Sequence, residues 1–542
     1  MKEYLHEIIS QALEQFNLDE MPNIQTEKPK HADHGDASSN IAMLLAKPLR
    51  NNPRKIAEQI VDSIQYDTAK ISAVEIAGPG FINFRYASNY LVDELAHILS
   101  EGNNYGKTEL NKDKKVLVEF VSANPTGPLT VGHGRNAMLG DTVARLLEWT
   151  GAKVDREYYF NNAGRQMRVL GQSVQARYLE SLGQSATFPE GGYEGGYIKD
   201  IAEELVKEHG ETLVNAEDET VFKEKAEDQI FKDISHTLGR MNIHMDSYFN
   251  ENSLYENGSI DKTIDEFKKQ DLAYDADGAT WFRTTSFGKE KDTVLVKSTG
   301  EPTYRLPDIA YHANKLDRGY DLCIDIFGAD HIDTYPDVLS GIKALGHNPD
   351  QVDVVVYQFV TIVKDGQPFK MSTRKANFVT LDELMDEVGA DVTRFFFLMR
   401  SPNTHLEFDI AQAKEAGEKN PVFYLQYAHA RIQSILRKVA EQYTFEGSPD
   451  LSLLTHHTEE KLVKDMLKLP EIVEGAAESR EPHRIITYLN ELASDFTSFY
   501  HDCRIIGVEE DLVQARAALA NATAQVLRNG LTILGITAPD KM

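Results

Sequence analysis

The chain has 542 residues, of which 41% are hydrophobic, and a formal net charge of −28 at pH 7. A chain of this length buries a substantial core and is expected to divide into about three or four domains. Its two cysteines, Cys323 and Cys503, lie far apart, so neither a paired-cysteine zinc site nor a disulfide framework is indicated, which fits a reducing cytoplasm. No run approaches ~18 apolar residues and the amino terminus has no signal-peptide pattern, so we expect neither secretion nor membrane insertion.

The acidic charge argues at first against a nucleic-acid partner, because phosphate binding depends on clustered lysine and arginine. Surface charges more than ~8 Å apart are, however, largely screened at physiological salt, so a local basic groove can bind a polyanion on an acidic protein. Net charge alone therefore leaves nucleic-acid binding open.

Residues 1–110 are expected to form a compact α+β unit. Apolar residues at helical spacing predict a first helix: Leu5, Ile8, Ile9, Leu13 and Phe16. Pro53 suits the first turn of a helix that runs to about Ile64. The segment SAVEIAGPGFINFRY at 72–86 predicts two strands around a Gly-Pro-Gly turn.

The region 111–410 has the pattern of a parallel, doubly wound α/β sheet. Buried strands are predicted where apolar runs lie between charge and turn signals: VLVEFVS (116–122), KVDREYYF (153–160), DLCIDIFGADH (321–331) and VDVVVYQFV (352–360). Apolar residues at three- and four-residue spacing after the first strand predict a helix that Gly151 terminates. The long interval before the third strand predicts one or more insertions at about 170–300.

The expected insertions carry two local signals. The glycine-rich segment FPEGGYEGGYI at 188–198 lacks the spacing of a phosphate-binding loop, so a flexible insertion is the favoured interpretation. At 274–283, YDADGATWFR places an Asp-Gly turn between strand-prone flanks, which indicates that a strand-rich insertion ends there.

Residues 411–542 are predicted to form an all-α helical bundle, because strand patterns stop at about residue 410. Two long amphipathic helices are marked by apolar residues at helical spacing: Ile485, Leu489, Leu492, Phe496 and Phe499, then Leu512, Leu519, Val526 and Ile533.

The segment NPTGPLTVGHGRNAMLGD at 124–141 follows the first predicted parallel strand and begins a helix. The crevice beyond such a strand binds ligands, and the helix directs free N–H groups and its positive dipole end toward a phosphate. Gly132 and Gly134 remove side chains where a nucleotide comes close, and His133 is placed to donate a hydrogen bond to phosphate. A lone histidine is more often a core or cap residue, but the flanking glycines and the preceding strand favour a functional role.

A second basic segment, QPFKMSTRKANFVTLDEL at 367–384, places Lys370, Arg374 and Lys375 before a helix capping box that starts at Thr380. A mobile loop that closes on phosphate is the functional interpretation. By composition alone, a solvated charged loop is an equally good interpretation.

A third segment, GEPTYRLPDIAYH at 300–312, places Tyr304 and Asp308 four residues apart. If the segment is helical, the two side chains share a face, and a carboxylate beside an aromatic ring suits a guanidinium or ammonium ligand. A surface helix explains this pair equally well.

These segments together resemble a known family. TVGH (130–133) resembles the HIGH motif and KMSTR (370–374) the KMSKS loop of class I aminoacyl-tRNA synthetases. More specific segments, distributed over nearly the whole chain, resemble arginyl-tRNA synthetases: HGDASSNIAMLLAK (34–47), VEFVSANPTGPLTVGHGR (118–135), REYYFNNAG (156–164), FGADH (327–331), RFFFLMRSPNTHLEFD (394–409), YLQYAHARI (424–432) and VLRNGLTILGITAPDKM (526–542).

The resemblance implies a fold and a reaction. The fold is a Rossmann-like catalytic domain at 111–410, an α+β domain at 1–110 that binds the tRNA elbow, and a helical anticodon-binding domain at 411–542. The reaction joins L-arginine to ATP as arginyl-adenylate, releases pyrophosphate, and transfers the arginyl group to the terminal adenosine of tRNA(Arg). The implied partners are thus tRNA(Arg), arginine and ATP, without a membrane, and we expect a cytoplasmic monomer.

The resemblance also implies site residues. His133 and Lys370 stabilise charge in the transition state, and no protein ligand set for a metal is expected because Mg²⁺ accompanies ATP. The arginine-binding residues are expected to be Glu119, Ser122, Asn124, Tyr304 and Asp308. The ATP-binding residues are expected to be Thr130, Gly132, His133, Gly328, Asp330, His331, Lys370, Met371, Ser372 and Arg374. The tRNA-binding residues are expected to be Tyr424, Tyr427, Arg431 and Tyr500, for which core packing is an equally good interpretation.

Two positions depart from the class I motifs. Thr130 replaces the first histidine of HIGH, and Thr373 replaces the second lysine of KMSKS, so Arg374 or Lys375 is expected to supply the missing charge.

Two alternatives come from other classes. An RNA-binding relative without catalysis is opposed by the retained His133 and Lys370, and a nucleotidyltransferase for a small metabolite is opposed by the long helical carboxyl-terminal region.

Overall fold

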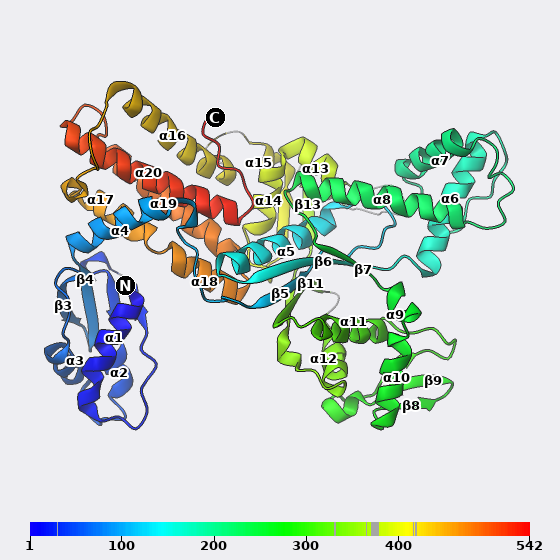
Figure 1. Ribbon diagram of the computed structural model, residues 1–542, viewed down its shortest axis with the longest axis horizontal. Helices are drawn as coiled ribbons and strands as arrows, with labels where there is room; N and C mark the ends of the chain where they lie inside the picture. Colours follow the sequence, from blue (N-terminus) through cyan, green and yellow to red (C-terminus); the bar gives the residue numbers. More distant parts are fainter. Residues whose placement is uncertain (30, 330–331, 365, 370–378, 416, 418–419) are drawn as a thin grey trace.

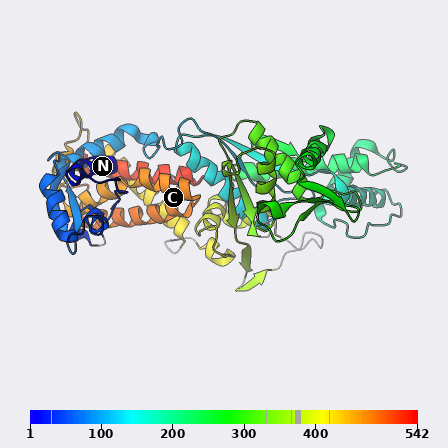
Figure 2. The ribbon, with the colours of Figure 1, turned by 90° about the horizontal axis from the view of Figure 1, so that it is seen from below.

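The computed structural model describes residues 1–542 except 30, 330–331, 365, 370–378, 416 and 418–419. The molecule is elongated, with the amino-terminal unit and the helical bundle at one end and two insertions at the other (Figure 1). Figure 2 shows the same division from a perpendicular direction, with the parallel sheet between the two ends. No helix in the described part of the chain is long and apolar enough to cross a membrane.

The amino-terminal unit is a four-stranded antiparallel sheet covered by short helices. Its strand order is β1-β2-β4-β3. The strands are β1 (Thr26–Glu27), β2 (Ala37–Ser39), β3 (Ile71–Ala77) and β4 (Phe81–Tyr86), and the helices are α1 (Lys2–Leu13), α2 (Ile41–Leu45) and α3 (Pro53–Ser63). The predicted first helix, the helix that begins at Pro53 and the two strands around Gly-Pro-Gly are therefore confirmed.

The next helix, α4 (Ser88–Glu101), packs elsewhere. Its buried residues Leu91, Leu95 and Ile98 join the large core shared by the catalytic and helical regions, whereas the core of the first unit runs from Leu5 to Phe84. An amphipathic pattern alone does not say which partner a helix covers, so the sequence grouped α4 with the elements before it.

The central sheet is parallel throughout, in the order β12-β11-β5-β6-β7. Its strands are β5 (Lys115–Glu119), β6 (Lys153–Phe160), β7 (Ser247–Asn250), β11 (Leu322–Gly328) and β12 (Val352–Tyr357). Its helices are α5 (Val131–Trp149), α11 (Arg305–Asp317) and α12 (Tyr335–Ala344). After β5 the chain adds strands on one side and later returns to the other, so a topological switch point lies between β5 and β11, where ligands bind in open sheets of this kind.

Strand β7 was not predicted, and it divides the inserted region into two parts. The first part is helical, with α6 (Gly164–Ser181), α7 (Gly196–His209) and α8 (Thr220–Arg240). The second contains α9 (Asn252–Glu256), α10 (Ser259–Lys269) and an antiparallel sheet of β8 (Ala273–Ala276), β9 (Ala279–Phe282) and β10 (Thr293–Val296). The two parts form separate lobes in Figure 1. Only the second lobe is strand-rich, as YDADGATWFR predicts.

The chain leaves the sheet through a small second sheet and then becomes helical. The small sheet holds β13 (Val360–Lys364), β14 (Gln367–Phe369) and β15 (Leu406–Asp409). The helices are α13 (Leu381–Val388), α14 (Ala390–Leu398), α15 (Ile410–Lys414), α16 (Pro421–Gln442), α17 (His457–Met466), α18 (Leu469–Ser479), α19 (His483–Asp502) and α20 (Glu510–Ile533). Helices α19 and α20 confirm the two predicted amphipathic helices, and the predicted fold class is confirmed as a whole.

Candidate active site

Helix α5 begins at the predicted phosphate site with a capping box. Thr130 is the N-cap, and its backbone N–H donates to Nδ1 of His133 at 3.1 Å. Burial lowers the pKa of His133, so the ring is neutral and carries its proton on Nε2. His133 is thus a cap residue, as the structural alternative expected, and its Nε2–H remains a donor for a phosphate oxygen.

The end of the basic loop lies beside the start of α5. Thr380 bridges to Thr130, the Val131 N–H donates to the Val379 carbonyl at 3.2 Å, and the Leu381 N–H donates to the Leu129 carbonyl at 2.8 Å. Thr380 also forms the predicted capping box of α13 with Glu383. These antiparallel bonds join residues 129–131 to residues 379–381, the described end of the basic segment, although the two are far apart in the sequence. The expected site residues Lys370, Met371, Ser372 and Arg374 lie outside the described residues, as do Thr373 and Lys375.

The two glycines of the turn have different surroundings. Gly132 is exposed, and a Cβ there would meet only the Thr130 hydroxyl at 3.4 Å. A Cβ on Gly134 would instead meet Phe397 at 2.9 Å and Leu381 at 3.0 Å. The structure therefore gives Gly134 a packing role against α13 and α14, in place of the expected approach of a nucleotide.

A buried charge cluster joins α11 to the two central strands. Glu119 on β5 and Asp325 on β11 are register partners, and the Lys315 ammonium lies 2.5 Å from a carboxylate oxygen of each. His312 Nε2 lies 2.7 Å from Asp325, and its Nδ1 lies 2.7 Å from the Asp308 carbonyl, so both nitrogens donate as in an imidazolium. The two cations balance the two carboxylates. Burial alone would raise the pKa of Asp325, but Lys315 and His312 hold it far below its ordinary value.

Glu119 was predicted from the sequence, whereas Lys315, His312 and Asp325 were not. The spacing of Asp308, His312 and Lys315, by four and then three residues, places them on one face of a helix and could have indicated that they lie together. The pairing with Asp325 depends on strand order, which no local pattern reports.

Two further carboxylates, Glu251 and Asp308, lie near this cluster. Glu251 accepts hydrogen bonds from neutral donors, the Tyr159 hydroxyl and the Asn161 amide, each at 2.8 Å. Burial, together with the fields of Glu119 and Glu251, raises the pKa of Asp308 to about 7. Neither Glu251 nor Asp308 has an ion pair within the described part of the chain. The region therefore has an excess of negative charge that a bound cation would neutralise. The sequence analysis missed Glu251, and no local signal marks it.

Two of the other expected arginine-binding residues, Ser122 and Asn124, lie just after the end of β5. The Ser122 hydroxyl donates to Glu119 at 2.9 Å, while the Asn124 amide accepts from the Asn161 N–H at 3.0 Å and donates to Gln166 at 3.1 Å. Tyr304 is the N-cap of α11 and is 86% exposed, so its ring does not pack on Asp308 as expected.

Of the ATP-binding residues expected at the end of β11, only Gly328 belongs to the described part of the chain. Gly328 ends β11, is buried and pairs in register with Tyr357 of β12. The other expected residues of this segment, Asp330 and His331, lie outside the described residues.

Three family models match the chain. They are the arginyl-tRNA synthetase N-terminal domain at 3–86, the catalytic domain of class I tRNA synthetases (R) at 94–413, and the DALR anticodon-binding domain at 425–542. The chain belongs to the arginyl-tRNA synthetase family.

Individual relatives agree with the family models. The arginine–tRNA ligase of Salinibacter ruber is 52% identical over 564 residues that cover 100% of both chains. That of Desulfotalea psychrophila is 52% identical and covers 95% of this chain and 94% of its own. The solved arginyl-tRNA synthetase of Thermus thermophilus shares the fold, with a TM-score of 0.78 at 22% identity and 100% coverage of each chain.

The expected tRNA-binding residues of this synthetase divide into packed and exposed groups. Tyr424 is half-buried against the core. Tyr427 is 47% exposed and Tyr500 is 37% exposed. The Arg431 guanidinium lies 4.6 Å from the centre of the Tyr500 ring, which joins α16 to α19 at the surface. The structure thus brings Arg431 and Tyr500 together, whereas Tyr424 has the core-packing role that the sequence left open.

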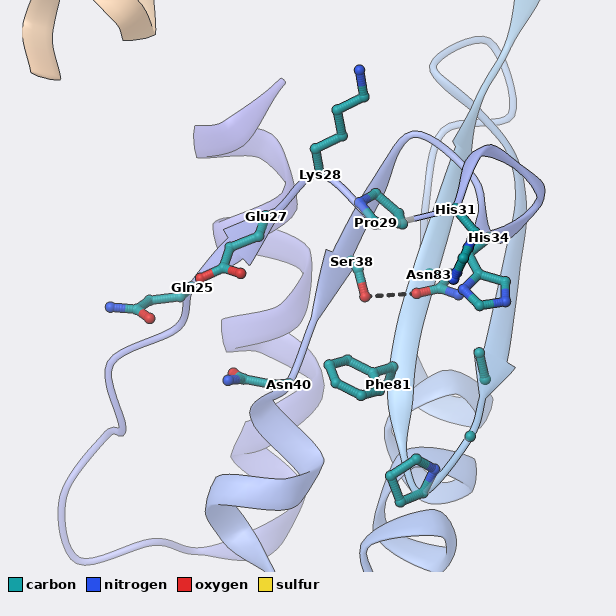
Figure 3. Close-up of a pocket in the computed structure, with 13 residues that line it drawn as sticks. Gln25, Glu27, Lys28, Pro29, His31, His34, Ser38, Asn40, Phe81 and Asn83 are labelled. Carbon is teal, nitrogen blue, oxygen red and sulfur yellow. Dashed lines mark hydrogen bonds between the residues drawn. The ribbon is translucent and has the colours of Figure 1, made fainter. Parts of the chain in front are cut away.

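A pocket on the amino-terminal domain was not predicted. It has a volume of about 420 Å³ and lies between the segment 25–40 and the β3–β4 turn. Figure 3 shows the Phe81 ring beside the Ser38 hydroxyl, which donates to the Asn83 amide oxygen at 2.6 Å, with His31 and His34 nearby. The only signal in the sequence was the Gly-Pro-Gly turn that precedes Phe81.

Proposed function

We propose that the protein activates L-arginine with ATP and transfers the arginyl group to the 3′-terminal adenosine of tRNA(Arg), releasing AMP and pyrophosphate. The observation that carries this proposal is the carboxylate pair Asp308 and Glu251, which forms no ion pair within the described residues and lies beside the balanced Glu119 cluster. Family membership supports the same reaction.

The excess negative charge suits arginine in particular. Guanidinium is a planar fork of donors that stays charged, and carboxylates in fixed geometry bind it through paired hydrogen bonds. A lysine ammonium is a single point, so it would leave some of the buried acceptors unpaired and bind weakly. We assign the side chain of arginine to Asp308 and Glu251, and its backbone end to Ser122 and Asn124.

The chemistry at α5 is charge stabilisation. As the arginine carboxylate attacks the α-phosphorus, the Nε2–H of His133 and the helix N-terminus stabilise the developing negative charge. Lys370 has the corresponding role on the pyrophosphate side. Neither residue transfers a proton.

Mg²⁺ is proposed to accompany ATP. The start of α5 presents N–H groups and an imidazole donor, which fit phosphate oxygens and not a cation, so phosphate and water are the expected ligands of the ion. The ion would neutralise phosphate charge.

Two surfaces are proposed to contact tRNA(Arg). The Arg431–Tyr500 pair offers a cation and an aromatic face to an unstacked anticodon base, and Tyr427 lies on the same helix as Arg431. The amino-terminal pocket is proposed to receive a base from the tRNA elbow, with stacking on Phe81 and hydrogen bonds to polar groups around it. We propose that the protein is a cytoplasmic monomer, in which both cysteines remain reduced.

Arginine-dependent charging of tRNA tests the function directly. Purified protein with ATP, Mg²⁺ and tRNA should form acid-precipitable radiolabelled arginyl-tRNA, and lysine in place of arginine should give none. Binding of tRNA without charging would instead support the non-catalytic relative, and nucleotidyl transfer that needs no tRNA would support the small-metabolite enzyme.

A further inference from the structure

The chain turns sharply where β5 ends. Val121 and Ser122 are consecutive residues with left-handed backbone angles, φ +66° and +44°. A β-branched side chain is a rare and unfavourable occupant of this region, and such outliers persist only where neighbouring groups impose them. Val121 is also buried, so the turn is part of the core and not a loose surface loop.

One buried amide group bonds directly to the backbone of Val121 in this turn. Asn136 lies on α5, about one turn after His133, and its Oδ1 accepts the Val121 N–H at 2.5 Å. Its Nδ2 donates to the carbonyl of Ile326 on β11 at 2.8 Å. The amide is buried and both of its ends are used, so it connects α5 to the carboxyl ends of the two strands that border the ligand crevice.

We propose that Asn136 is a positioning residue for arginine, acting through the Val121–Ser122 turn. The turn directs the Ser122 hydroxyl to Glu119 and places Asn124 against the backbone of Asn161. Without the bond from Asn136, Val121 relaxes toward an extended conformation, and Ser122 and Asn124 leave the positions that bind arginine. This inference rests on the proposed function, because it assigns arginine to these residues.

The first test separates arginine binding from ATP binding. Pyrophosphate exchange is measured with tRNA present, as a function of arginine at saturating ATP and the reverse. For Asn136→Ala we expect the KM for arginine to rise about tenfold or more, as misplaced binding groups require, with a smaller change in the KM for ATP. An unchanged arginine KM, or equal increases in both KM values, would overturn the proposal.

The second test asks whether the strained turn is the link. Glycine adopts positive φ without steric cost, so Val121→Gly should restore much of the arginine affinity in the Asn136→Ala background. The matched control is Val121→Ala in the same background, which removes the same methyl groups but keeps the Cβ and therefore relieves only the part of the strain that β-branching adds. Rescue by glycine alone supports the proposal. No rescue, or equal rescue by alanine, overturns it.

Two controls keep the result interpretable. If Asn136→Ala fails to fold by circular dichroism, Asn136→Gln replaces it in both tests, because the longer amide stays polar but cannot make both bonds; native arginine KM in that variant overturns the proposal. The native protein is assayed first. Absence of arginine-dependent exchange there would refute the proposed function itself, independently of the role of Asn136.

Discussion

His133 uses one ring nitrogen for structure and leaves the other for chemistry. Nδ1 accepts the bond that caps α5, and this bond fixes the tautomer that exposes an N–H at Nε2. The cap and the ligand contact are therefore compatible, and the two interpretations of this histidine do not compete. Truncating His133 removes both the capping bond and the ligand contact, so a control variant is needed beside it.

His133→Ala is expected to slow adenylate formation by roughly 100-fold, the usual loss when one transition-state donor is removed. The KM for arginine should change little, since His133 contacts the phosphate side. Single-turnover adenylate formation with tRNA present measures this effect. His133→Gln is the matched control because glutamine at this position can restore the capping box with Thr130 and still present an N–H donor; a rate within a few-fold of native in His133→Ala would reduce His133 to a structural cap.

The raised pKa of Asp308 predicts that the affinity for arginine depends on pH. Its pKa of about 7 in the empty site lies above the ordinary value of 3.8, so the carboxyl is increasingly protonated as pH falls below 7. Arginine needs the charged form, so its affinity should weaken by about tenfold in total between pH 8 and pH 6. Titration of arginine KM against pH tests this, and Asp308→Asn should show weak binding with little pH dependence. A flat profile in the native protein would contradict the assignment.

The raised pKa of Asp308 also makes folding stability depend on pH, with a sign opposite to that of a carboxylate in an ion pair. The folded state holds the Asp308 proton up to about pH 7 while the unfolded state loses it near 3.8. The contribution of this group to folding stability therefore falls as pH rises between these values. Asp308→Asn should raise the melting temperature of the ligand-free protein at pH 8 and have little effect at pH 4. Equal effects at both pH values would argue against a raised pKa.

At the scale of elements, the pairing of 129–131 with 379–381 brings the end of the basic loop to the start of α5. A short connection therefore leads from Lys370, Arg374 and Lys375 to the His133 site. We expect the two motifs to act on one ligand, because these backbone bonds hold the residues 379–381, which follow the second motif in the sequence, beside the start of α5.

We expect Arg374 to replace the missing second lysine of the loop, because its rigid fork can hold two phosphate oxygens at once. Arg374→Ala and Lys370→Ala should slow single-turnover adenylate formation and spare arginine binding, while Lys375→Ala should be nearly silent. Full activity in Arg374→Ala beside a large loss in Lys375→Ala would reverse the assignment. Full activity in all three variants would falsify the phosphate-binding role of the loop.

At the scale of the whole molecule, the amino-terminal domain has its own core and meets the helical bundle largely through charge. Lys2 pairs with Glu471 at 3.0 Å, Lys464 with Asp36 at 2.9 Å and Lys28 with Asp465 at 3.6 Å. Tyr86 contacts both cores at the point where the chain crosses. Salt screens the exposed Lys2–Glu471 pair most strongly and the two pairs with a largely buried carboxylate less.

We therefore expect high salt to loosen the amino-terminal domain without unfolding it. The distance distribution between fluorophores on α3 and α19 should broaden between about 0.1 and 1 M salt, where the screening length falls to about 3 Å. Lys464→Gln should broaden it already at low salt, while Lys232→Gln, which removes an exposed ion pair in the first insertion, should not. A distribution that is insensitive to salt would show that apolar contact holds the domain.

The local patterns determined much of the fold. Strands such as 116–122 and helices such as 485–499 were predictable because burial imposes a period on neighbouring residues. The signature segments, read as a resemblance, indicated the family, the reaction and positions such as His133 and Asp308.

Only the tertiary structure decided which distant groups meet. The sequence did not predict β7, the packing of α4 on the helical bundle, the Lys315–Asp325 pair, the position of Glu251 or the contact of Arg431 with Tyr500. It also gave no sign that Val121 is left-handed, since valine disfavours that conformation and the bond that Val121 makes to α5 comes from a residue outside the turn. Strand order, charge balance and backbone strain arise from contacts between remote segments. The hydrophobic period of a helix or strand and the capping of a helix arise within a few neighbouring residues. A sequence shows directly only these local features.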